Sequence, residues 1–405
     1  MGMNDTPVAN RVHIGFFGRR NVGKSSVVNR VTGQNLSIVS DTLGTTTDPV
    51  RKTMELLPLG PVLIIDTPGY DDEGELGQLR VEKTRQMLRQ TDVAVLVADA
   101  GQGLGEWEQD LLDLFRERAQ PYIIAYTKAD TLPDHAPAGE HEIYISALTG
   151  EGIQELKEKI AHATRTDDLK KQLVGDLLGP EDVAVLVTPI DSAAPKGRLI
   201  LPQQQVIRDV LETEGICVVV REDQLTAALA SLSKKPALVV TDSQAFRQVD
   251  AQTPPDIPLT SFSILMARFK GTLEESVKAV AQIERLEDGD KVLIAEGCTH
   301  HRQCNDIGTV KIPNWLKNHT GKRITIETAS GTEFPDDLTH YKLVLHCGGC
   351  MLNEREMQYR QRTAKAQGVP MTNYGIAIAY MNGILKRSIA MFPQLLRQLE
   401  GGEEV

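Results

Sequence analysis

The stretch Gly18-Arg-Arg-Asn-Val-Gly-Lys24-Ser25 decides the fold of the first part of this 405-residue chain. Its two glycines, followed by lysine and serine, have the spacing of a phosphate-binding loop. The apolar residues 12–17 before it predict a strand, and the residues after it predict a helix. In such a loop, backbone N–H groups surround phosphates at the helix N-terminus, Lys24 supplies a positive charge, and the Ser25 hydroxyl can bind Mg²⁺. The stretch therefore predicts a nucleotide site.

Apolar runs alternate with helical patterns along the whole chain, which predicts an α/β fold. The predicted strands of the first domain form a parallel sheet with helices on both faces; they are 12–17, 62–65, 93–97, 122–125 and 143–145. Two further α/β domains are predicted from the runs 183–187, 216–220 and 237–240, and then 291–295, 324–326 and 341–345. The prolines within 253–258 indicate a boundary. We therefore expect three domains, at 1–168, 169–260 and 261–405.

The composition excludes several classes of function. Lysine and arginine number 44 against 55 aspartates and glutamates, for a net charge of −11, and no long basic block is present, so nucleic acid is not an expected partner. We expect no membrane association and a cytoplasmic location, because we find neither a membrane-spanning apolar run nor a signal-peptide pattern. Four of the five cysteines lie between positions 298 and 350, which favours thiolate ligation over disulfides.

Further polar motifs follow the phosphate-binding loop: the first can serve as a switch, and each of the other three comes at the end of a predicted strand. They are Gly44-Thr-Thr-Thr-Asp48, Asp66-Thr-Pro-Gly69, Thr127-Lys-Ala-Asp130 and Ser146-Ala147. This ordered set resembles the translation-factor-like GTPases, the group that includes Era and the tRNA-modifying TrmE. The resemblance implies that Asp130 binds guanine, Lys128 packs over the base, and the Ala147 N–H meets the guanine oxygen.

The same resemblance implies GTP and Mg²⁺ as cofactors. Mg²⁺ would be bound by Ser25 and Thr46, and hydrolysis would depend on Lys24, Thr46, Asp66 and Gly69. The full set of implied nucleotide-binding residues is Gly18, Asn21, Gly23, Lys24, Ser25, Ser26, Thr46, Asp66, Gly69, Lys128, Asp130, Ser146 and Ala147.

Three positions of the GTPase motifs need separate interpretation. Thr127 stands where the base-reading motif normally has asparagine, so we expect the loss of an amide that braces the loop. Tyr70 stands where Ras-like switches place the glutamine that orients water, which predicts slow hydrolysis. Asn21 has two interpretations of equal weight: in the resembling family such an asparagine is associated with a K⁺ ion, and asparagine also stabilises turns.

A second candidate site contains cysteines. Cys298, and the pair Cys347 and Cys350, come just after the predicted strands 291–295 and 341–345. If these strands are parallel neighbours, their carboxyl ends meet at one edge of the sheet, and three thiolates could face one point. The residues alone leave a redox pair, a closed zinc site completed by histidine, and an iron–sulfur cluster with one open iron as alternatives.

The spacing Cys298-Thr-His300 and His346-Cys-Gly-Gly-Cys350, with the unusual run 189–202, resembles the HydF family, the maturation GTPases of di-iron (FeFe) hydrogenases. The resemblance implies that Cys298, Cys347 and Cys350 hold a 4Fe–4S cluster, with His300 or His346 as an exchangeable or second-shell partner. It also implies a GTP-hydrolysing scaffold or carrier, forming a homodimer or higher homo-oligomer. Such a carrier would receive a di-iron subcluster precursor bearing CO and cyanide, made with radical-SAM maturases, and deliver it to apo-hydrogenase.

The competing interpretation is a ribosome- or tRNA-modification-linked GTPase with a structural zinc or iron–sulfur site. The acidic balance and the absence of a basic domain argue against it. The basic residues that follow the cysteine motif have two interpretations: a solvated helix face, or a surface that neutralises anionic cargo or docks an acidic partner. These residues are Arg355, Arg360, Arg362 and Lys365.

Overall fold

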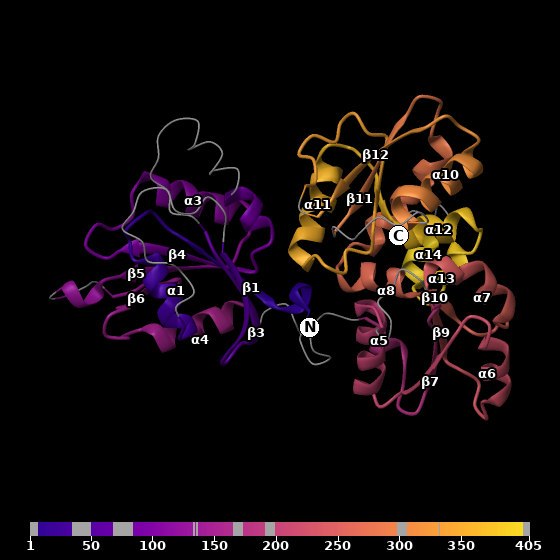
Figure 1. The fold of residues 1–405 in the computed structure, drawn as a ribbon, viewed down its shortest axis with the longest axis horizontal. Coiled ribbons are helices and arrows are strands. Elements are labelled where there is room, and N and C mark those ends of the chain that lie inside the picture. The colour runs from indigo at the N-terminus through magenta and orange to yellow at the C-terminus, as the bar shows by residue number, and fades with distance from the viewer. Residues whose placement is uncertain are drawn as a thin grey trace. The chain divides into compact units, whose positions relative to one another are not determined.

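The structure is a computed structural model that describes residues 7–34, 50–67, 84–132, 134, 137–164, 173–190, 199–297, 306–331 and 333–399. The chain forms two compact units, Met1–Lys170 and Lys171–Val405, which Figure 1 colours from indigo to magenta and from magenta to yellow. No helix among these residues has the length and apolar character needed to cross a membrane. Each unit is described separately below.

The first unit contains one six-stranded sheet in the order β2-β3-β1-β4-β5-β6. Five strands are parallel: β1 (Val12–Phe17), β3 (Gly60–Asp66), β4 (Val93–Asp99), β5 (Tyr122–Thr127) and β6 (Glu142–Tyr144). The edge strand β2 (Val50–Leu56) is antiparallel to β3. The apolar central strands are buried on both faces, which is typical of parallel sheets.

Helices cover both faces of this sheet, so the predicted α/β architecture is confirmed. One core is built from α1 (Lys24–Thr32), α4 (Ile153–Thr164) and the sheet side chains that face them. A second core on the opposite face contains α3 (Glu106–Glu117) and the helical residues 84–89. The helices cover the two faces of the sheet, and loops follow the carboxyl ends of its strands.

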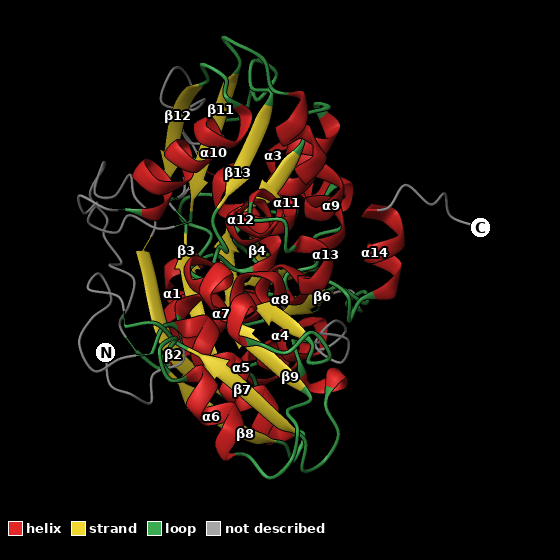
Figure 2. Ribbon diagram, turned by 90° about the vertical axis from the view of Figure 1, so that its right-hand side faces the viewer, coloured by secondary structure: helices red, strands yellow, loops and turns green. Residues whose placement is uncertain are grey.

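The second unit contains two four-stranded sheets whose strands are all parallel. The first has the order β10-β9-β7-β8, formed by β7 (Val183–Val187), β8 (Ile216–Val220), β9 (Leu238–Thr241) and β10 (Leu259–Ser261). The second has the order β12-β11-β13-β14, formed by β11 (Lys291–Glu296), β12 (Thr325–Ser330), β13 (Leu343–His346) and β14 (Met371–Asn373). Figure 2 shows β12, β11 and β13 side by side.

The helices of the second unit connect these strands, except for the last three, which follow β14. They are α5 (Leu201–Glu212), α6 (Leu225–Ser231), α7 (Phe246–Gln252), α8 (Phe262–Phe269), α9 (Leu273–Ala279), α10 (Ile312–Thr320), α11 (Glu354–Ala366), α12 (Tyr374–Met381), α13 (Leu385–Ser388) and α14 (Pro393–Leu399). Helix α9 is followed directly by the 3-10 helix η6 (Val280–Arg285).

Helix α8 joins the two sheets of this unit. Its Leu265 and Met266 belong to the core of the first sheet, whereas Ile264 belongs to the core of the second. The strand β10, which pairs with β9, extends across the predicted domain boundary at residue 260. The division of the chain into three domains stays a prediction.

Candidate nucleotide and metal sites

The phosphate-binding loop connects β1 to α1, as the sequence predicts. Gly23 precedes the helix in the left-handed region with φ 89°, a conformation that favours glycine. At Gly18 a Cβ would lie 2.6 Å from the carbonyl oxygen of Val97, so the close approach to β4 also requires glycine. Asn21 has φ 63°, which asparagine tolerates better than most residues. The loop backbone is therefore set by its own sequence.

Two buried charged side chains meet beside this loop. Lys24 begins α1, Asp66 ends β3, and the Lys24 ammonium donates a hydrogen bond to the Asp66 carboxylate. Because β1 and β3 are parallel neighbours, both groups lie at the carboxyl edge of the sheet. Ser25 and Ser26 follow in the first turn of α1. Thr46, Gly69 and Tyr70, which the sequence analysis relates to GTP hydrolysis, lie outside the described residues.

Thr127 lacks the family's amide, as the sequence analysis states, but its hydroxyl contacts the phosphate-binding loop instead. Its buried hydroxyl lies 2.5 Å from the carbonyl oxygen of Val22 and 3.1 Å from that of Ala98. The single hydroxyl proton serves one of these acceptors at a time. A hydroxyl therefore links the base-reading loop to the phosphate-binding loop where the family motif has an amide.

Lys128 makes a second link between the two loops. Its ammonium donates to the carbonyl oxygen of Asn21 at 3.1 Å and to the Asp99 carboxylate at 2.7 Å. Burial raises the pKa of Asp99, but the Lys128 ammonium and backbone N–H groups outweigh it and hold that pKa below its usual value. Asp130 follows, exposed, in the 3-10 turn η2 (Ala129–Thr131).

The last predicted nucleotide residues, Ser146 and Ala147, come after β6. The buried Ser146 hydroxyl oxygen accepts a hydrogen bond from the Thr149 N–H at 3.1 Å, which shapes this loop. Strands β5 and β6 are parallel neighbours, so this loop starts at the same sheet edge as Lys128. The described part of the predicted GTPase set thus lies along one edge of one sheet.

The candidate metal centre begins where β13 ends. Strands β11 and β13 are parallel neighbours, as the cysteine argument required, and the Cys347 N–H donates to the Ala295 carbonyl at 2.9 Å. The Cys347 sulfur accepts N–H bonds from Gly297 at 3.1 Å and from Gly349 at 3.4 Å. Gly349 has φ 60°, in the left-handed region. Gly297 is the residue before Cys298, so the chain leading to that cysteine touches the Cys347 sulfur.

Burial raises the pKa of the Cys347 thiol to about 11, and the two N–H donors oppose this effect. Burial also raises the pKa of Cys350, against the nearby charge of Lys270. Such thiols stay protonated at neutral pH unless a metal displaces the proton. Two soft sulfur donors, one of them already held by two N–H groups, fit the thiolate ligation of iron–sulfur or zinc centres.

The convergence of all predicted ligands stays a prediction. Cys298 and His300, with the neighbouring His301 and Cys304, lie outside the described residues. Across the described ranges, no group of three or more histidine, cysteine, aspartate and glutamate side chains is arranged to hold a metal ion. The structure therefore brings the Cys347 sulfur together with Gly297, the residue before Cys298.

His346 is fully buried and both of its ring nitrogens have partners. Nε2 lies 2.9 Å from Nη1 of Arg360, and Nδ1 lies 2.7 Å from the Cys347 carbonyl oxygen. Since arginine only donates, Nε2 accepts and Nδ1–H donates to the carbonyl. Burial, helped by the Arg360 charge, lowers the pKa of His346 to about 3 and keeps the ring neutral. Of the two roles predicted for His346, this geometry favours the second-shell one.

Arg360 is buried on α11. It is therefore part neither of a solvated helix face nor of a surface for anionic cargo or an acidic partner, the two interpretations drawn from the sequence. Its side chain is 1% exposed; it donates to Glu356 at 2.8 Å and to the Gly331 carbonyl at 2.7 Å, and it lies over the Phe334 ring. Arg362 and Lys365 are exposed, and Lys365 pairs with Glu275 at 2.8 Å. Arg360 thus belongs to the packing behind His346.

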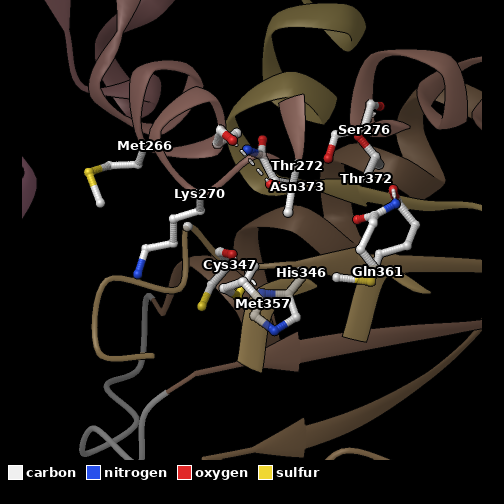
Figure 3. Close-up of a pocket in the computed structure, with 13 residues that line it drawn as sticks. Met266, Lys270, Thr272, Ser276, His346, Cys347, Met357, Gln361, Thr372 and Asn373 are labelled. Atoms are coloured by element: carbon white, nitrogen blue, oxygen red, sulfur yellow. Dashed lines mark hydrogen bonds between the residues drawn. The ribbon is translucent and has the colours of Figure 1, made fainter. Parts of the chain in front are cut away.

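Lys270 is a buried residue near this centre that the sequence analysis missed. It follows α8 and donates from its ammonium to the Leu352 carbonyl oxygen. With His346 and Cys347 it lines a small cavity, whose other residues include Thr272, Gln361 and Asn373 (Figure 3). A lysine at a helix C-terminus is common on protein surfaces, so the sequence holds no signal of its burial.

Comparison with known proteins assigns a family to each part of the chain. Residues 13–128 match the family model for the 50S ribosome-binding GTPase. Residues 173–271 match the hydrogen maturase F dimerization domain, and residues 274–391 match the hydrogen maturase F tetramerization domain.

Several individual GTPases are similar to part of the chain. The tRNA modification GTPase MnmE of Legionella pneumophila (strain Corby) is 37% identical over 147 residues, covering 35% of this chain and 32% of that protein. GTPase Der of Rhizobium leguminosarum bv. trifolii (strain WSM2304) is 31% identical over 196 residues, covering 45% of this chain and 39% of that protein. A crystal structure of Era from Aquifex aeolicus, bound to GDP and AlF4⁻, is 19% identical with a TM-score of 0.35, covering 59% of this chain and 97% of that one.

The chain spans about a third of the length of the curated relatives it matches. The two adjoining matches at residues 173–271 and 274–391 belong to a single, more specific family. A GTPase domain followed by the dimerization and tetramerization domains of hydrogen maturase F places this chain in the HydF family.

Proposed function

We propose that this chain is a GTP-hydrolysing scaffold that holds a 4Fe–4S cluster and carries a di-iron precursor to apo-FeFe-hydrogenase. The observation that carries the proposal is the Cys347 sulfur, held by two backbone N–H groups beside the approach to Cys298. This sulfur lies inside the range that matches the tetramerization domain of hydrogen maturase F. The GTPase matches support the nucleotide part of the proposal.

In the nucleotide part, Lys24 would bind the phosphates of GTP, and Ser25 and Asp66 would hold Mg²⁺. The Lys24–Asp66 contact already places these groups at one sheet edge. Lys128 and Asp130 would bind the guanine base, while Thr46 and Gly69 would complete the switches. Asn21 would add a K⁺ ion beside the phosphates, and its left-handed backbone turns the loop in the same place.

In the metal part, Cys298, Cys347 and Cys350 would hold the cluster. A 4Fe–4S cluster with three thiolate ligands offers its fourth iron to an exchangeable ligand. The N–H groups of Gly297 and Gly349 would stabilise the negative sulfur of Cys347. His346 and Arg360 would fix the end of β13, which leaves His300 as the histidine for the exchangeable position.

The family match also supports self-association, because residues 173–271 match a dimerization domain. Strand β8 is an edge of the first sheet in the second unit and exposes Ile216 by 48% and Val219 by 43%. An exposed apolar edge strand offers both unpaired backbone groups and apolar area to a second copy. We assign the dimer contact to this edge, and we place radical-SAM maturases and apo-hydrogenase among the partners of a cytoplasmic carrier.

Activation of apo-hydrogenase tests this function. The protein would be reconstituted anaerobically, loaded with the di-iron precursor, repurified and mixed with apo-hydrogenase. We expect hydrogenase activity from the native protein and none from Cys347→Ser, with Ser231→Ala as the control, since Ser231 is exposed at the end of α6. A loaded native protein that activates no more than free precursor would refute the carrier role.

A further inference from the structure

Lys270 places a buried positive charge beside the candidate metal centre. The residue is 3% exposed, and its ammonium donates to the carbonyl oxygen of Leu352, two residues after Cys350. Burying an ammonium costs free energy that nearby negative groups can offset. The position of this charge therefore affects whether the centre binds negatively charged or neutral ligands.

Lys270 lies beside the turn that carries Cys347 and Cys350. Lys270 and Cys347 line the same cavity (Figure 3). Contact with the Leu352 carbonyl fixes the ammonium next to the loop that carries Cys350.

The chemistry of the proposed centre gives this charge a role. A 2+ cluster core with three thiolates carries a net charge of about −1, and an anionic fourth ligand makes the total about −2. In a poorly hydrated site, each added negative charge is unfavourable unless a cation lies close by. A neutral ligand such as imidazole adds no charge and gains much less from the cation.

We propose that Lys270 is a specificity-determining residue that favours small anionic ligands, of the cyanide class, over neutral ligands at the open iron. This inference rests on the proposed function, because it requires a cluster with one exchangeable position. Lys270 acts only through its fixed positive charge. It is not a ligand of the cluster, whose protein ligands are the three thiolates. It would thereby help to hold an anionic cargo.

The test compares ligand affinities in charge variants. Lys270→Met removes the charge, and Lys270→Gln also removes it but keeps a donor for the Leu352 carbonyl. Lys278→Met is the matched control, because Lys278 is exposed and pairs with Glu274. Each protein would be reconstituted anaerobically, assayed for iron, and titrated with cyanide and separately with imidazole, with the electron paramagnetic signal of the reduced cluster as readout.

We expect both Lys270 variants to bind cyanide about tenfold more weakly, as removal of one partly screened charge interaction predicts. Imidazole affinity should stay within about twofold, and Lys278→Met should match the native protein. An unchanged ratio of cyanide to imidazole affinity in Lys270→Gln overturns the inference, whatever Lys270→Met does. Loss of iron from both Lys270 variants also overturns it, since Lys270 would then only support the loop. Absence of iron from the native protein would instead refute the proposed function.

Discussion

At the scale of single residues, Thr127 shows how a substitution in a motif can keep its structural role. Its hydroxyl joins the base-reading loop to Val22 of the phosphate-binding loop. Thr127→Val keeps the shape but leaves a buried acceptor without this donor, at a cost of about 1–3 kcal/mol. We expect GTP affinity to fall about fivefold or more, measured by fluorescent-nucleotide titration. Thr164→Val, whose hydroxyl bonds only within α4, should have no effect, and an equal loss in both variants would contradict the bracing role.

A second residue-scale prediction separates the two roles of His346. His346→Ala removes the acceptor of the buried Arg360, so the free energy of unfolding should fall by about 2–4 kcal/mol. His346→Gln can still accept from Arg360 and should keep most of that stability. Urea denaturation measures both changes. The electron paramagnetic signal of the reduced cluster should be unaltered in His346→Gln and altered in His300→Ala; the reverse pattern would make His346 the exchangeable ligand.

At the scale of secondary-structure elements, β8 yields a prediction about assembly. Ile216→Glu combined with Val219→Glu places two charges on an exposed edge strand, where pairing with a second copy would bury them. We expect a lower oligomeric state by analytical ultracentrifugation, with unchanged circular dichroism. Val50→Glu, on the exposed edge strand β2, is the control. A variant that keeps the native mass would place the dimer contact elsewhere.

The elements also show what the sequence could predict. Buried parallel strands such as β4 and β11 have continuous apolar runs, and these runs were sufficient to predict the strands. Strand β2 was missed because charged residues fill it and most of it is exposed, and β14 because it has three residues. At the metal centre, Cys347 was found from its motif, whereas Lys270 was missed and Arg360 was expected at the surface. Charge in a sequence normally indicates surface, and only tertiary packing buries it.

At the scale of the whole molecule, the nucleotide residues and the cysteine motif belong to different compact units. Lys24→Ala removes the phosphate-binding charge and leaves every residue of the second unit unchanged. We therefore expect nucleotide binding to be lost while iron content stays near the native value, both measured on the same preparation. Lys159→Ala removes a half-buried lysine of α4, whose ammonium donates to the Glu140 carbonyl oxygen, and should change neither quantity. A large loss of iron from Lys24→Ala would show that the two units do not keep their sites independently.

The central claim is that this GTPase chain also holds an iron–sulfur cluster, and metal analysis tests it most directly. The full-length protein would be purified and reconstituted anaerobically, and then assayed for iron, acid-labile sulfide and zinc, with a Cys347→Ser variant prepared in parallel. We predict about four irons and about four sulfides per chain in the native protein and a large loss of both in the variant. One tightly bound zinc per chain, without sulfide, would contradict the claim.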